Sequence, residues 1–242
     1  MLVQKENTIG EVVAQNFHTA RVFEDFGLDF CCGGKKTISD ACRERGINPD
    51  ALLNNLTVTG HAAGTAAHYD KWGLDFLADY IIANHHTYVL NEITTIEHHL
   101  DKVTSKHGEK HPEVIKINSL FSELKDELLV HMQKEEKMLF PYIKKMVFAS
   151  KNALDFPFPP FGSVINPVAV MENEHENAGK LMGEISKVAN SYAPPEDACT
   201  TFRILYNELA EFEADLHVHI HLENNILFPK AVSLEKSFSI NN

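Results

Sequence analysis

The sequence contains few cysteines, few cationic residues and no long apolar run. Its 242 residues include four cysteines, too few for a disulfide framework, so we expect the reducing cytoplasm. Lysine and arginine number 22 against 34 acidic residues, and the net charge of −12 disfavours nucleic acid and anionic membranes as partners. No apolar run reaches the roughly 18 residues of a membrane span, and the N-terminus lacks the apolar core of a signal peptide.

Helical patterns cover most of the chain and predict an all-α protein. Residues 1–57 show apolar residues at helical spacing and predict a small N-terminal helical domain. Residues 58–72 are rich in small residues, have no sustained apolar face and predict a linker. Residues 73–242 hold four long helical patterns, at about 74–107, 112–149, 167–190 and 196–234. A proline-rich crossover at 155–162 separates the second pattern from the third, so we expect an up-down four-helix bundle.

One motif occurs twice within the predicted bundle. Each copy reads H-x-x-x-E and then continues through an aliphatic pair to Phe-Pro. The first copy begins with His131 and Glu135, and the second with His219 and Glu223, 88 residues later. Four residues make about one helical turn, so each His shares a helix face with its Glu. A His and a carboxylate stacked in this way can reach one metal site.

Each copy also has a partner His upstream. His86 precedes the first copy by 45 residues, and His175 precedes the second by 44. In an up-down bundle these two His and both motifs fall at about the same level along the helix axes. His85 is the neighbouring alternative to His86. We choose His86 because the residues four before it and three, seven and fourteen after it are all apolar.

Four His and two Glu exceed the needs of one tetrahedral zinc site. Two metal ions, each bound by two His and both bridged by the two Glu, would use all six residues. Nitrogen and oxygen donors with open positions favour non-haem iron, with manganese or zinc as alternatives. The competing interpretation is a structural bundle without metal, which would have to bury two carboxylates with no cation nearby.

Further polar residues surround these positions. Glu127 and Asp215 are also 88 residues apart, and each lies four residues before a predicted ligand His. Each either accepts the second ring N–H of that His or is solvated. His217 and His221 lie two residues from His219, off the Glu223 face, so we expect both to be solvated. We expect His98 and His99 to lie on the surface.

The motifs resemble a known family. The bundle is similar to hemerythrin-like di-iron bundles, and nearly the full length resembles the RIC (Repair of Iron Centers) proteins, which are bacterial di-iron proteins. The matching stretches are DFCCGG at 29–34, HMQKEE at 131–136, MENEHE at 171–176 and HIHLENNILFP at 219–229. The family's metal ligands fall on His86, His131, Glu135, His175, His219 and Glu223.

The resemblance implies repair of iron–sulfur clusters damaged by nitric oxide or oxidants, as part of a stress response. Either iron delivery to the damaged cluster or nitric oxide reduction at two carboxylate-bridged iron ions would serve this role, and the latter would make the protein an enzyme. The implied partners are damaged iron–sulfur proteins, nitric oxide or oxygen, and a second copy of the chain. The alternative function is an oxygen- or nitric-oxide-binding sensor or storage protein.

Cys31 and Cys32 are adjacent, and this disfavours a structural disulfide between them because the ring would be strained. The pair is a candidate for redox chemistry or iron transfer, as thiolate ligands, a redox pair or an intermolecular link. Two ordinary buried cysteines are the alternative. We expect Gly33 and Gly34 to adopt positive φ and expose both sulfurs. Cys42 and Cys199 are expected to be structural.

Overall fold

The computed structural model describes residues 3–61, 68–156, 159 and 161–240, and it confirms the all-α prediction. Within these residues the only β pairing is an isolated antiparallel bridge between Thr8 and Thr37. None of the helices in the described part combines the length and the apolar character needed to cross a bilayer.

The four long helical patterns of residues 73–242 form as predicted, and three of them include a π-helical turn. The first is α5 (Leu74–Ile81), π turn η3 (Ile82–His86) and α6 (Thr87–His107); the second is α7 (Glu113–Lys134), π turn η4 (Glu135–Leu139) and α8 (Phe140–Lys151); the third is α9 (Ile165–Val188); the fourth is α10 (Thr200–Leu222), π turn η5 (Glu223–Leu227) and α11 (Phe228–Ile240). The fourth pattern begins and ends slightly later than predicted. Residues 157, 158 and 160 of the predicted crossover lie outside the described residues.

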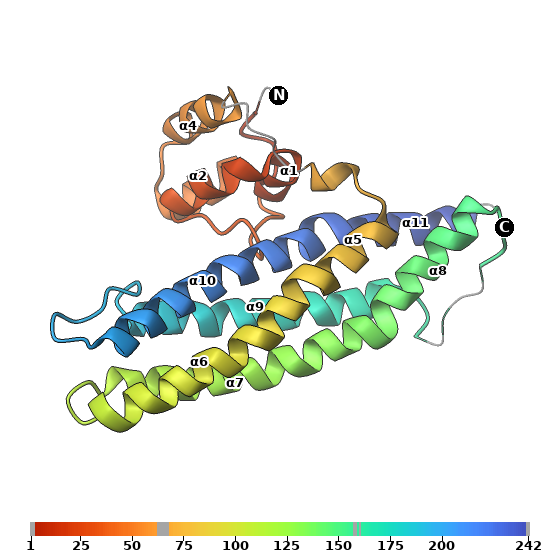
Figure 1. The fold of residues 1–242 in the computed structure, drawn as a ribbon. Coiled ribbons are helices and arrows are strands. Elements are labelled where there is room, and N and C mark those ends of the chain that lie inside the picture. The colour runs from red at the N-terminus through yellow and green to blue at the C-terminus, as the bar shows by residue number, and fades with distance from the viewer. Residues whose placement is uncertain (1–2, 62–67, 157–158, 160, 241–242) are drawn as a thin grey trace. The chain divides into compact units, whose positions relative to one another are not determined.

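The chain divides into two compact units, and one of them comprises Asp79–Tyr142 and Asn166–Leu216. It contains α6, α7, α9 and most of α10 (Figure 1). Ion pairs fix the direction of its helices. Residue numbers rise along η3 and α6 while they fall along α10, as the contacts His85–Asp215 and His99–Glu208 show. These two helices are therefore antiparallel, as an up-down arrangement requires.

Apolar residues three and four apart form the core of this unit. The α6 residues Val89, Ile93, Ile96, Leu100 and Val103 are buried, as are the α7 residues Val114, Ile117, Phe121, Leu124 and Leu128. Phe121 packs edge-to-face against Phe212 of α10 with ring centroids 5.5 Å apart. The apolar stripes that were visible in the sequence thus face one another and leave the charged residues outside.

The other unit comprises Met1–Ala78, Ile143–Ile165 and His217–Asn242. Its N-terminal part holds α1 (Ile9–Gln15), a 3₁₀ turn η1 (Phe17–Thr19), α2 (Ala20–Asp25), α3 (Ile38–Arg45) and α4 (Pro49–His61). Thr8 and Glu11 form a capping box at the start of α1, and Gly46 ends α3 at φ 67°. Both helix ends thus carry residue types that are typical of helix caps.

The helical pattern of residues 1–57 is interrupted at Asn16, which is extended and whose side chain accepts a hydrogen bond from the backbone N–H of His18. The predicted linker needs one correction. The first residues of the predicted linker are helical, since α4 continues to His61. Residues 62–67 lie outside the described residues, and Tyr69–Lys71 form a short 3₁₀ turn, η2.

Candidate metal centre

The π turns coincide with predicted ligands. His86 is the last residue of η3, while Glu135 and Glu223 are the first residues of η4 and η5. A π turn adds a residue to the helix and re-aims the side chains around it, and such turns often occur at functional sites. Both Phe-Pro pairs begin directly after a π turn, so the helix continues through each proline without breaking.

One set of ring nitrogens gathers around Glu135. The Nε2 atoms of His86 and His131 each lie 3.4 Å from Glu135 Oε2. His175 Nε2, from α9, lies 3.0 Å from His131 Nε2. All four side chains are buried, and Glu135 is 0% exposed. Two imidazole nitrogens at this distance can share one proton or face one cation.

The second motif has the same internal geometry. His219 Nε2 lies 3.2 Å from Glu223 Oε1, and both residues are buried, with Glu223 0% exposed. The spacing of four residues places both side chains on one face of α10 and η5, as the sequence predicts. The two motifs thus give two buried His–Glu pairs that are 88 residues apart in the chain.

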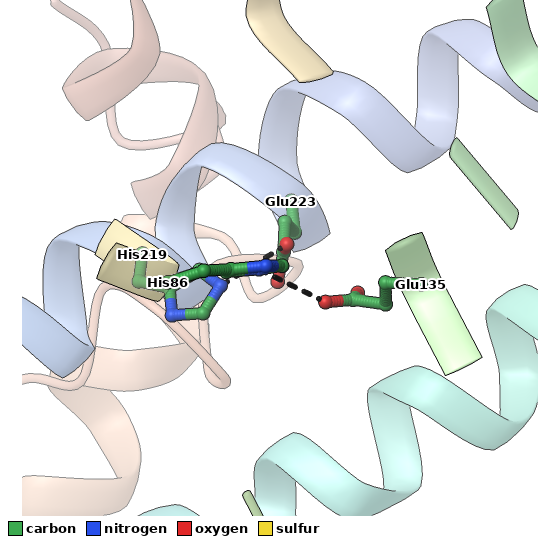
Figure 2. A group of neighbouring side chains, drawn as sticks. All are labelled: His86, Glu135, His219 and Glu223. Atoms are coloured by element: carbon green, nitrogen blue, oxygen red, sulfur yellow. Dashed lines mark hydrogen bonds and ion pairs between the residues drawn. The ribbon is translucent and has the colours of Figure 1, made fainter. Parts of the chain in front are cut away.

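The six predicted ligands form two overlapping groups of donor atoms. One group is His86, Glu135, His219 and Glu223, drawn in Figure 2 with the side chains turned toward one another, and the other is His131, Glu135, His175 and Glu223. Within each group the donor atoms lie within 4.8 Å of one another. Both carboxylates belong to both groups, while each group has its own pair of His. This donor set fits two metal ions bridged by two carboxylates.

The burial of the two carboxylates shows whether the site suits bound cations. Moving two ionised carboxylates into the interior is unfavourable unless positive charge compensates them. A pair of divalent cations would supply that charge, and the nitrogen and oxygen donors suit iron. The residues therefore fit a di-iron centre. The assignment of each of the six side chains as a ligand stays a prediction.

Outer carboxylates orient two of the predicted ligands. His86 Nδ1 donates to Glu136 over 2.8 Å, and His131 Nδ1 donates to Glu174 over 2.9 Å. These bonds direct the Nε2 atoms inward and fix the ring orientation. Glu174 also accepts from Lys134 Nζ. The hydrogen bond from His131, followed by that from Lys134, lowers the pKa of Glu174 to about 2, so it stays ionised.

Of the two alternatives for Glu127 and Asp215, pairing with the motif His is the one that the structure does not show. Glu127 accepts from Asn177 and does not pair with His131. Asp215 pairs with His85 over 2.9 Å and does not pair with His219. Spacing along one helix missed Glu174 because it comes from α9, across the α7–α9 contact. The adjacent sequence MENEHE, in which Glu174 directly precedes His175, was the available signal.

The Cys31–Cys32 turn is organised by Asp29. The backbone N–H groups of Cys31 and Cys32 both donate to Asp29 Oδ1, at 2.9 and 3.0 Å. The Cys31 Sγ lies 3.2 Å from the same oxygen and 3.7 Å from the Cys32 Sγ, so the two thiols are not joined by a disulfide. The donor atoms of these three residues lie within 4.8 Å of one another.

The expected reason for the two glycines was wrong. Positive φ among the described glycines occurs at Gly27, Gly46 and Gly162, and not at Gly33 or Gly34. Gly33 is instead required because there is no room for a side chain: a Cβ at this position would lie 2.8 Å from the Asp29 carbonyl oxygen.

The expected exposure of both sulfurs also needs correction. Cys31 is only 4% exposed, although Cys32 is half-buried. The hydrogen bond with Cys32, together with burial, raises the pKa of the Cys31 thiol. Cys42 is buried as expected, whereas Cys199 is exposed. His221 was expected to be solvated, but it is fully buried.

Comparison with known proteins agrees with these features. Residues 77–231 match the Hemerythrin HHE cation binding domain, and residues 5–59 match a Domain of Unknown function (DUF542). The iron-sulfur cluster repair protein ScdA of Staphylococcus epidermidis is 30% identical over 95% of this chain and 99% of its own. The iron-sulfur cluster repair protein YtfE of Dickeya chrysanthemi is 32% identical over 94% of this chain and 97% of its own, and that of Cronobacter sakazakii is 34% identical over 96% and 99%.

Proposed function

Because the chain belongs to the family of iron–sulfur cluster repair proteins with a hemerythrin HHE cation binding domain, we propose that it repairs iron–sulfur clusters damaged by nitrosative or oxidative stress. The proposed centre holds two iron ions between His86, His131, Glu135, His175, His219 and Glu223. The observation that carries this proposal is the pair of buried carboxylates that belong to both donor groups.

The side chains divide the work at this centre. Glu135 and Glu223 supply the charge that balances the cations, and the four imidazoles supply neutral nitrogen donors. Glu136 and Glu174 hold the Nδ1 protons of His86 and His131, which keeps Nε2 available as a donor. When bound, carboxylate-bridged iron with open positions supplies redox chemistry suited to nitric oxide or oxygen, or iron for delivery.

The turn at Cys31 and Cys32 is the proposed place of iron transfer to the damaged cluster. Thiolates are soft ligands of the kind that iron–sulfur clusters use. Asp29 adds an oxygen donor within 4.8 Å of both sulfurs. The raised pKa of Cys31 keeps that thiol protonated until the iron(II) cargo arrives, and the displaced proton then passes to solvent.

The proposed partners follow from this chemistry. The macromolecular partner is an iron–sulfur protein with a damaged cluster, as the names of the relatives indicate. The small-molecule partners are nitric oxide or oxygen at the iron centre, and a second copy of the chain is proposed as a homodimer partner. We place the protein in the cytoplasm, where the two thiols remain reduced.

A double variant, Cys31→Ser with Cys32→Ser, tests the proposal. We expect iron near two per chain and an unchanged absorption spectrum, because the bundle residues are intact. Reactivation of a nitric-oxide-treated iron–sulfur dehydratase should fall at least about tenfold, which is the size of effect seen when residues that support a metal site are mutated. Cys199→Ser removes an exposed thiol and should retain full repair. Full repair by the double variant would refute the transfer role, and an iron-free wild-type protein would refute the di-iron proposal.

A further inference from the structure

Three polar residues on α10 and η5 form a stripe interleaved with the predicted ligands. The stripe consists of His217, His221 and Asn225, spaced by four residues. His219 and Glu223 are each two residues away from members of the stripe. Residues two apart on a helix point to nearly opposite sides, so the same stretch carries metal ligands on one face and this stripe on the other.

Asn225 holds the backbone of the Cys31–Cys32 turn. Its Nδ2 donates to the carbonyl oxygens of Phe30 and Cys31, at 3.2 and 3.1 Å. Its Oδ1 lies so close to Gly10 and Gly34 that a Cβ on either glycine would be 2.3 Å away. The side-chain amide therefore occupies a space that only glycine leaves open. This close approach explains Gly34 better than backbone conformation does.

His221 supports the same contact from the preceding turn. Its Nδ1 lies 3.2 Å from Asn225 Nδ2, and its ring packs against Phe17 and Phe30 with centroids 6.0 and 5.6 Å away. His221 is 0% exposed, so its ring is enclosed by these apolar neighbours. His217 completes the stripe, with its ring 6.0 Å from that of Phe30.

The first copy of the repeat provides an internal comparison. The positions equivalent to His221 and Asn225, 88 residues earlier, are Gln133 and Lys137. Both are exposed, and Lys137 donates to Gln133 over 3.3 Å. The ligand face is therefore duplicated in the repeat, whereas the stripe face is specific to the second copy. A requirement of the metal centre alone would not produce that difference.

We propose that Asn225 is a positioning residue for the thiols: it fixes the Cys31–Cys32 turn on the helix that carries Glu223 and keeps the Cys31 sulfur buried. The two hydrogen bonds to consecutive carbonyls define the orientation of the turn. His221 Nδ1 contacts the same Nδ2 atom of Asn225. The importance of this position for repair rests on the proposed function. The positioning itself determines how exposed the thiols are, and this exposure can be measured without a repair assay.

The test is the alkylation rate of each cysteine in the iron-loaded full chain, read by mass spectrometry. Asn225→Asp keeps the size of the side chain but replaces the donor with an acceptor that faces two carbonyls. Alkylation of Cys31 by iodoacetamide should accelerate about tenfold, the effect of losing roughly one to two net hydrogen bonds. Iron content should stay near two per chain. Cys42, buried in the same N-terminal helices, should react as slowly as before.

Cys42 and a second variant separate positioning from general unfolding. Equal acceleration at Cys31 and Cys42 would show loss of the whole fold around them and would overturn the proposal, as would an unchanged rate at Cys31. Gly34→Ala places a Cβ 2.3 Å from Asn225 Oδ1 and 2.7 Å from the Phe30 carbonyl oxygen, so it forces the amide and the turn apart and should reproduce the Cys31 effect. Lys137→Ala changes the equivalent exposed position of the first copy and should leave all rates unchanged. The same alkylation rates are expected even if the thiols prove dispensable for repair. The positioning role of Asn225 and the repair role of the thiols can therefore be refuted independently.

Discussion

At the scale of single residues, the His of the predicted metal centre pair with carboxylates that the two copies of the repeat do not share. Glu174 precedes the predicted ligand His175 in the sequence, yet its contact is with His131 on another helix. An ionised acceptor on Nδ1 fixes the ring and raises the basicity of Nε2. Glu174 thus contributes to two predicted ligands, as a chain neighbour of one and a hydrogen-bond partner of the other.

Glu174→Gln should weaken iron binding about tenfold, because Nδ1 of His131 loses its charged acceptor. The measurement is iron retention against a competing chelator at neutral pH. Glu176→Gln on the same helix is the matched control, since Glu176 is exposed and pairs with Lys180 on the surface. Equal iron retention by the two variants would show that Glu174 does not support the centre.

The Cys31 thiol should react slowly at neutral pH and respond to pH over an unusual range. Alkylation requires the thiolate, and the hydrogen bond with Cys32 together with burial raises the pKa of Cys31 above its ordinary value of 9.0. Its alkylation rate should therefore continue to rise as the pH passes 9. The rate of each cysteine between pH 7 and 10 checks this, with exposed Cys199 as the accessible reference. A Cys31 rate that levels off below pH 9 contradicts the assigned environment.

At the scale of helices, the π turns are the feature that coincides with three of the predicted ligands. The turns η4 and η5 begin at Glu135 and Glu223, at the same point of the repeat, and each ends just before Phe-Pro. An added residue rotates every later side chain relative to the earlier ones. The π turn thus lets the face that carries the His and Glu of the motif, and the apolar face that follows it, both point into the bundle.

Deletion of Lys137 should convert η4 to regular α-helix and rotate one side of it by about 100°. Either Glu135 or the buried Phe140 then leaves its position, so we expect loss of more than half of the iron. Helical circular dichroism should persist, because Lys137 is exposed and the helix can close over the gap. Lys137→Ala keeps the chain length and should retain its iron. A deletion variant with normal iron content would show that the π turn is dispensable.

The sequence predicts helices and the six clustered residues well because both depend on local spacing. The 88-residue repeat and the apolar stripes were sufficient to place His86, rather than His85, beside Glu135. Contacts across helices were not predictable in this way. The pairing of Glu174 with His131, and the burial of His221 against Phe17 and Phe30, depend on how the helices pack.

The reason for Gly34 could not be read from the sequence either. A glycine is needed there because Asn225, 191 residues later in the chain, approaches it closely. The local pattern Cys-Cys-Gly-Gly indicates a turn but does not say what lies against it. Residues far apart in the sequence thus decide whether a glycine is required by its backbone conformation or by close packing.

At the scale of the whole molecule, a duplicated helical unit carries one proposed metal centre, and only its second copy carries the stripe that contacts the Cys31–Cys32 turn. The ligand faces of the two copies are alike because both must provide a His and a Glu. The outer faces differ, because Lys137 is exposed whereas Asn225 is half-buried and lies against Gly10 and Gly34. Duplication therefore accounts for the proposed centre, and divergence of the second copy accounts for the contact with the thiols.

Iron determination with Mössbauer spectroscopy on anaerobically purified protein tests the di-iron centre most directly. We predict two irons per chain in the wild-type protein and a spectrum of coupled non-haem iron. Glu135→Gln, which preserves side-chain size but removes the charge shared by both donor groups, should lose most of that iron. His98→Ala, at an exposed His, should retain it. Wild-type protein with one iron or none, or a Glu135→Gln variant that keeps both irons, would contradict the carboxylate-bridged centre.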